Sequence, residues 1–227
     1  YTKDWQKFID YNIVDVELVS RLEEKMKLIE LAVALAYDAK VNMQDVYYQV
    51  RMWDTLIYNF LKKKGIVVPP GKRSDKDEKY AGAYVKEPIA GRYNWVVSFD
   101  LNSLYPHLIM QYNISPETLV EKRHPSATVN GLLSQKVEVP KEFCLCANGA
   151  MYRKDIHGFL PEMMKKIYDE RVQSKKLMIL AKQEYEKTPT KELEKSISKY
   201  NNIQMARKIQ LNSAYGCLLY TSPSPRD

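Results

Sequence analysis

The most informative stretch of the sequence reads Asp100-Leu101-Asn102-Ser103-Leu104-Tyr105-Pro106. It follows residues 94–99, a run of β-branched and aromatic residues that predicts a short buried strand. A carboxylate at a strand end projects into the crevice beyond the sheet, where it can hold a hard cation such as Mg²⁺. Residues 103–111 then predict a helix with Pro106 in its first turn, where proline is tolerated. Taken alone, an aspartate such as Asp100 is more often a cap or turn residue than a metal ligand.

A second informative stretch reads Lys208-Ile209-Gln210-Leu211-Asn212-Ser213-Ala214-Tyr215-Gly216. In a helix Lys208, Asn212 and Tyr215 fall at positions i, i+4 and i+7 and therefore share one face. The alternative for this stretch alone is an amphipathic helix with an incidental lysine.

The segment before it is predicted to form an antiparallel helical hairpin. Residues 161–186 and 191–215 have long helical patterns, and the short polar joint 187–190 separates them. Arg171 and Lys175 lie one helical turn apart, so both cations can point at the same anion. An Arg/Lys pair at this spacing is otherwise a solvated helix face.

The first part of the chain, residues 1–65, is helical in pattern. Apolar residues recur at helical spacing between Val16 and Ile29, and residues 28–37 read as a buried helix. We expect Asn42 to cap a further helix, which ends in three lysines followed by Gly65.

The middle of the chain contains two less regular segments. The proline, glycine and charge content of residues 66–92 predicts a linker or exposed loop. Scattered turn formers between residues 115 and 150 predict loops and short strands.

Composition limits the classes of protein to be considered. With 45% hydrophobic and 11% aromatic residues, the chain of 227 residues can bury a core. No apolar run approaches the roughly 18–20 residues of a membrane span, so we expect no membrane association. The net charge of +7 is concentrated in residues 152–216, where 14 Lys/Arg face 8 Asp/Glu, which favours a polyanionic partner.

Cysteine usage points to a reducing compartment. The three cysteines, Cys144, Cys146 and Cys217, form no disulfide framework, and a lone C-x-C is a weak metal signal. We therefore interpret them as structural or incidental.

The two stretches together resemble known polymerase motifs. The first resembles motif A of family-B DNA polymerases, D-x-x-S-L-Y-P, and the second resembles their motif B, K-x-x-x-N-S-x-Y-G. Residues 80–83, Tyr-Ala-Gly-Ala, are similar to the Y-x-G-G/A element that joins the exonuclease and polymerase domains. Residues 11–15 look like the third exonuclease motif, Y-x-x-x-D, and residues 112–118 resemble replicative polymerases of large tailed phages. His107 departs from the family, which commonly has serine there.

The resemblance implies an α/β (α+β) fold that is mostly helical in this chain. It assigns residues 1–65 to the end of a 3′–5′ exonuclease domain with following helices, 66–92 to a linker, 93–160 to a partial palm with motif A, and 161–216 to fingers with motif B. Residues 217–227 do not continue the motif B pattern, and we interpret them as read-through of a sequencing adapter. The alternative for this tail is a natural disordered end.

The resemblance also implies roles for individual residues. Asp100 would bridge two Mg²⁺ ions, and Tyr105 would exclude a ribose 2′-hydroxyl as a steric gate; with Lys208 these are the expected catalytic residues. The remaining expected roles are nucleotide binding by Leu101, Ser103, Leu104, Tyr105, Arg171, Lys175, Lys208, Asn212 and Tyr215, DNA binding by Tyr80, Gly82, Tyr215 and Gly216, and exonuclease chemistry by Tyr11 and Asp15, with Asp15 as a metal ligand.

The function implied for the parent enzyme is DNA-templated DNA synthesis with 3′–5′ proofreading. Its expected partners are primer-template DNA, deoxynucleoside triphosphates and a sliding clamp, in the cytoplasm of a phage-infected bacterium. The sequence opens on Tyr1 rather than Met and no D-T-D motif C follows motif B, so we expect a piece that is inactive alone. The alternatives are a non-enzymatic basic helical module that binds nucleic acid, and a stand-alone nuclease.

Overall fold

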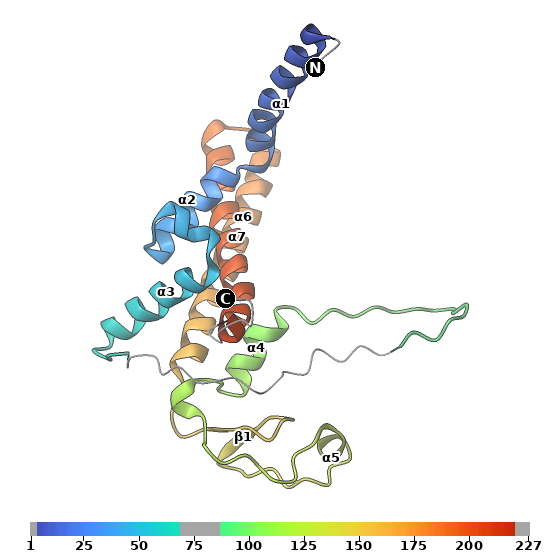
Figure 1. The fold of residues 1–227 in the computed structure, drawn as a ribbon, viewed down its shortest axis with the longest axis vertical. Coiled ribbons are helices and arrows are strands. Elements are labelled where there is room, and N and C mark those ends of the chain that lie inside the picture. Colours follow the sequence, from blue (N-terminus) through green and yellow to red (C-terminus); the bar gives the residue numbers. More distant parts are fainter. Residues whose placement is uncertain (1–3, 69–86, 221–227) are drawn as a thin grey trace. The chain divides into compact units, whose positions relative to one another are not determined.

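The computed structural model describes residues 4–68 and 87–220, with side chains as far as residue 215 (Figure 1). The chain divides into two compact units. The first comprises Tyr1–Ile66 and Ile167–Gln210, and the second comprises Val67–Lys166 and Leu211–Asp227. In agreement with the expected fold class, the described residues are mostly helical and contain one small antiparallel sheet. None of the described helices has the length and apolarity needed to cross a membrane.

The first unit begins with two helices separated by a single residue. Helix α1 spans Trp5–Met26 and helix α2 spans Leu28–Ala39. Asp4 caps α1 by accepting a hydrogen bond from the Lys7 amide at 3.0 Å. Between the helices Lys27 takes the left-handed conformation at φ 53°, which ends α1. The apolar pattern of the sequence thus continues across residue Lys27, where the helix itself is interrupted.

The α1 helix has no buried residue, whereas α2 buries Ala32, Leu35 and Ala39. The expected buried helix at residues 28–37 is therefore buried along one face only. Its exposed apolar side chains include Ile29, Val33 and Tyr37.

The next helix starts later than the sequence predicted. A 3₁₀ turn, η1, spans Met43–Tyr47, and α3 spans Gln49–Lys63. The prediction that Asn42 caps the long helix is wrong, because Asn42 precedes η1 and its side chain makes no capping bond. The predicted end is confirmed: the last turn carries lysines, and Gly65 has φ +70°, a conformation that suits glycine.

Two long helices complete the first unit and extend into the second. Helix α6 spans Phe159–Lys187 and α7 spans Lys191–Tyr220, which confirms the two predicted helices. Arg207 Nη2 lies 2.7 Å from Glu170 Oε2, and these residues stand at nearly equal distances from the joint. The helices therefore pack as an antiparallel pair (Figure 1). The backbone of α7 continues past Gly216, beyond the end that the sequence predicted.

The second unit contains one short helix of motif A and a small sheet. Helix α4 spans Leu104–Gln111, as predicted, with Pro106 buried in its first turn. It is followed by η2 at Pro116–Thr118 and α5 at Val129–Leu133. Strand β1, Phe143–Leu145, pairs antiparallel with β2, Met151–Arg153, and Cys144 lies opposite Tyr152.

The predicted strand at residues 94–99 is wrong. These residues form no strand, and Trp95 and Phe99 are 98% and 90% exposed. A strand persists only when its backbone groups join a ladder. In the described part of the chain β1 and β2 pair with each other, and no strand lies beside residues 94–99.

The start of α6 is held by side chains that follow α4. Asn113, at φ 54°, accepts a hydrogen bond from the Gly158 amide at 2.9 Å through Oδ1. Its Nδ2 donates to the carbonyls of Arg153 at 2.6 Å and Ile156 at 2.8 Å. The side chain is thus bonded at both ends in a site that leaves Asn113 only 8% exposed.

Ser115 and Glu117 complete this cap of α6. Glu117 Oε1 accepts from the Phe159 amide at 2.6 Å, and Ser115 Oγ accepts from the Leu160 amide at 3.4 Å. Ser115 Oγ also donates to Glu117 Oε2 at 2.6 Å. The first amides of a helix have no partner within the helix. Here residues 113–117 satisfy three of them from elsewhere in the chain, and we call this segment the α6 cap.

Candidate active site

Motif A combines an exposed aspartate with a sharp backbone turn. Asp100 is exposed and lies outside any helix or strand. Ser103 has φ 53° and precedes α4 without a side-chain capping bond, while its Oγ donates to Asn102 Oδ1 at 3.3 Å. The His107 ring donates from Nδ1 to the Ser103 carbonyl at 2.9 Å, one turn along the helix. Asp100 is therefore exposed to solvent a few residues before the first turn of α4, which the hydrogen bond between His107 and Ser103 stabilises.

Tyrosines from the two motifs meet in the second unit. The rings of Tyr105, on α4, and Tyr215, on α7, stack with centroids 4.2 Å apart and planes 20° from parallel. Stacking at this distance is a favourable aromatic geometry. Tyr105 remains 49% exposed, so the stack leaves part of its ring accessible. Sequence reasoning named both residues but did not predict their contact.

The expected triphosphate ligands of the first unit lie on its helical pair. Arg171 is half-buried and Lys175 is exposed, both on α6, and Lys208 is exposed on α7. Asn212 also lies on α7 and is exposed, in the part of that helix that belongs to the second unit. Leu101 and Leu104 are exposed on the motif A side.

Sequence reasoning missed a charged cluster beside these cations. Arg207 pairs with Glu170 and with Asp38, and its Nη1 donates to Gln210 Oε1 at 2.9 Å. Gln210 Nε2 donates to Asp38 Oδ2 at 2.7 Å, and Gln210 is fully buried. The opposite charges at positions 170 and 207, equally far from the hairpin joint, were a signal that could have revealed part of this cluster.

Metal ligands can be tested against the donors that the structure brings together. In the ranges described, no group of three or more His, Cys, Asp or Glu side chains gathers at one place. Mg²⁺ is usually held by one or two carboxylates with substrate phosphates and water. Asp100 fits one such ligand position, because its carboxylate is exposed before a turn. The donors for a complete pair of ions are not assembled within these ranges.

The expected exonuclease residues lie together on α1. Tyr11 and Asp15 are four residues apart and both are exposed. The expected DNA contacts Tyr80 and Gly82 fall outside the described residues. A further expected DNA contact, Gly216, is a residue of helix α7.

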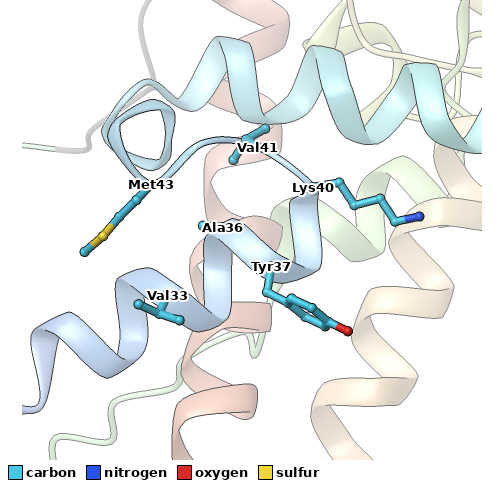
Figure 2. A pocket seen from close by; sticks show the side chains of 6 residues that line it. All are labelled: Val33, Ala36, Tyr37, Lys40, Val41 and Met43. Carbon is cyan, nitrogen blue, oxygen red and sulfur yellow. The ribbon is translucent and has the colours of Figure 1, made fainter.

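A pocket of about 530 Å³ lies in the first unit away from these residues. It is mainly apolar, and Figure 2 shows the side chains of Tyr37 and Lys40 extending on one side of it and Met43 on another. None of the expected site residues lines it. The full lining is Val33, Ala36, Tyr37, Lys40, Val41 and Met43.

The cysteines of the C-x-C stretch are free thiols. Cys144 is buried, and its Sγ lies 3.7 Å from the Gln111 carbonyl as a weak donor. Burial raises the pKa of the Cys146 thiol, so the thiolate that would ligate a metal is disfavoured. The interpretation of the cysteines as structural or incidental stays a prediction.

Comparison with known proteins identifies the class first by fold. A solved structure of the family B DNA polymerase from the archaeon Pyrobaculum calidifontis is similar to this chain with a TM-score of 0.56 and 25% identity, over 88% of this chain and 23% of that one. The fold is thus that of part of a DNA polymerase. The model of DNA polymerase family B matches residues 42–224. The chain belongs to DNA polymerase family B.

Sequence relatives agree with this and confirm the resemblance to phage enzymes. The DNA-directed DNA polymerase of Escherichia phage RB69 is 40% identical over 177 residues, and that of Enterobacteria phage T4 is 37% identical over 178 residues. These matches cover 78% and 76% of this chain. The chain spans 19% of the length of each of these curated relatives.

Proposed function

We propose that the protein containing this chain is a DNA-templated DNA polymerase that extends a primer with deoxynucleoside triphosphates. The family membership and the names of the phage relatives support this reaction. The observation that carries the proposal to particular residues is the stack of Tyr105 on Tyr215, because it joins the two polymerase motifs at one place. A basic helical module without enzymatic activity would require neither motif.

The proposed roles follow from charge and exposure. Lys175 and Lys208 are exposed cations, and with Arg171 they neutralise the triphosphate of the incoming nucleotide. Phosphoryl transfer depends mainly on positioning and on stabilisation of negative charge. Tyr105 lies under the sugar and excludes a 2′-hydroxyl, while the stack with Tyr215 holds its ring in place. Asn212 and the motif A residues Leu101, Ser103 and Leu104, in the second unit, are further proposed nucleotide-binding residues.

Family B polymerases use divalent metal ions, and we propose Mg²⁺ as the ion here. Two bound Mg²⁺ ions supply an activated primer hydroxyl and stabilisation of the leaving pyrophosphate. Asp100 is the ligand that this chain contributes, with further carboxylates supplied by other parts of the full-length protein. Because one carboxylate holds Mg²⁺ poorly, the chain alone is expected to be inactive in primer extension.

Further proposals extend to the whole protein. Tyr11 and Asp15 belong to a 3′–5′ proofreading site, and their place one turn apart on α1 is compatible with a shared substrate. Tyr80, Gly82 and Gly216 contact DNA. A sliding clamp is the proposed processivity partner, in the cytoplasm of a phage-infected bacterium.

The test uses a full-length polymerase that carries this segment. Tyr105→Ala should raise incorporation of ribonucleotides relative to deoxyribonucleotides, because the ring that clashes with the 2′-hydroxyl is removed. Tyr105→Phe is the matched control: it keeps the ring and the stack, so sugar selection should stay near that of the unmodified enzyme. A ratio that is unchanged in Tyr105→Ala would show that Tyr105 is a packing residue.

A further inference from the structure

The cluster around Arg207 lies directly beside the proposed triphosphate ligands. Arg207 precedes Lys208 on α7, and Glu170 precedes Arg171 on α6. The Arg207–Glu170 ion pair, at 2.7 Å, therefore connects the two helices at the level of these cations. The geometry of this ion pair therefore also determines the backbone positions of the neighbouring residues Arg171 and Lys208.

Through its guanidinium, Arg207 makes its ion pairs and hydrogen bonds within this cluster. Its side chain is 16% exposed and two carboxylates neutralise it, one from α6 and one from α2. The two Nη atoms are divided between them: Nη2 bonds Glu170, and Nη1 bonds Asp38 and Gln210. A planar guanidinium can hold several partners at fixed angles, which the point charge of lysine cannot do.

A second set of contacts fixes how α2 lies along α7. Glu30 Oε2 accepts from Asn202 Nδ2 at 3.0 Å and from Ser198 Oγ at 3.3 Å. Eight residues further along each helix, Asp38 accepts from Gln210. The equal spacing shows that α2 and α7 run parallel with matched register. A slip of one turn would break both sets of bonds.

We propose that Arg207 is a positioning residue, which acts through Lys208 and Arg171 rather than by touching the nucleotide. The planar guanidinium of Arg207, which we call its fork, holds α7 in register with α6 through Glu170 and with α2 through Asp38. Gln210 bonds both Arg207 and Asp38. The two neighbouring cations then reach the triphosphate from helices of fixed relative position. This inference rests on the proposed polymerase function.

The test measures single-nucleotide incorporation by a full-length polymerase that carries this segment. Arg207→Lys keeps the charge but loses the fork, and it should raise the KM for the nucleotide about tenfold with a smaller change in kcat. Asp38→Asn removes one carboxylate and should raise the KM about threefold. Affinity for primer-template DNA should remain unchanged in both variants.

A matched control separates positioning from loss of stability. Leu35 lies on α2 and is 5% exposed, so Leu35→Ala destabilises the first unit while it leaves every hydrogen-bonding and charged side chain of the cluster in place. At a temperature where each variant is folded, Leu35→Ala should keep the nucleotide KM of the unmodified enzyme. The Asp38→Asn variant carries the test if Arg207→Lys does not fold.

Three results decide the inference. A tenfold rise in KM for Lys208→Ala, with wild-type KM in Arg207→Lys and Asp38→Asn, would overturn the positioning role and leave the proposed function intact. An equal rise in KM for Leu35→Ala and Arg207→Lys would also overturn it. Unchanged nucleotide kinetics in Lys208→Ala would refute the proposed triphosphate site, and the inference with it.

Discussion

The two sides of motif A differ sharply in how the chain is held. Before Asp100, residues 94–99 expose nearly all of their apolar side chains and form no strand. After it, α4 leads within two residues into the α6 cap, where Ser115 is 2% exposed, and Thr118, which follows the cap, is 0% exposed. The apolar segment before Asp100 is therefore exposed to solvent, and we call it the open side, whereas the polar segment after α4 is buried.

The difference shows where each segment finds its bonding partners. The α6 cap closes its hydrogen bonds over a sequence separation of about 45 residues within one unit, from Asn113 to Gly158. Residues 94–99 have strong β propensity but no neighbouring strand in the described residues. Propensity for a strand reflects packing against neighbours, so it does not produce a strand by itself.

The largest effect is expected at Asn113. Asn113→Ala removes three hydrogen bonds to backbone groups, leaving buried partners unsatisfied, and it forces alanine into positive φ. We expect a loss of roughly 3–4 kcal/mol in the free energy of unfolding. Urea titration and hydrogen exchange of the Gly158 amide would measure it. Asn130→Ala, at an exposed asparagine in α5, is the control, and an equal effect there would contradict the comparison.

A somewhat smaller effect is expected at Gly158. A Cβ there would lie 2.6 Å from the Ser115 Cβ, so alanine must push the cap away from α6. We expect Gly158→Ala to cost roughly 2–3 kcal/mol. Gly91→Ala is the matched control on the open side, since its Cβ would meet nothing nearer than 3.5 Å. Thermal melts of both variants would test this, and similar melting temperatures would show that the cap can yield.

The smallest effect is expected in the open segment itself. Val97 is 69% exposed, so Val97→Ala should change the free energy of unfolding of this chain by no more than about 0.5 kcal/mol. The same urea titration measures it. A loss above roughly 1 kcal/mol would mean that residues 94–99 are packed in solution, and the contrast between the two sides would then disappear.

The long helices were predictable from sequence because their signals are local. The pattern of residues 161–186 and the polar joint after it define α6 and the start of α7 without reference to the rest of the chain. The α6 cap was not predictable in this way. Asn113 and Glu117 look like loop residues until the chain returns to place Gly158 and Phe159 beside them.

The candidate site was predictable as a set of residues but not as an arrangement. Tyr105 and Tyr215 were each recognisable from their motifs, yet their contact depends on how α4 meets the end of α7. Arg207 was passed over because the motif singles out its neighbour Lys208. Its role depends on Asp38, which lies 169 positions away in the sequence. Side chains that act through tertiary contacts leave little trace in local spacing.

The close approach of Gly158 to Ser115 also has an evolutionary consequence. The space between these positions holds the Ser115 side chain and has no room for a Cβ at position 158, and Ser115 needs its hydroxyl for the Leu160 amide. The amino acids that each position can accept therefore depend on the residue at the other position, and we expect substitutions at 115 and 158 to occur together. Among diverging lineages, a larger residue at 158 should be accompanied by glycine at 115 and by a replacement acceptor for the helix.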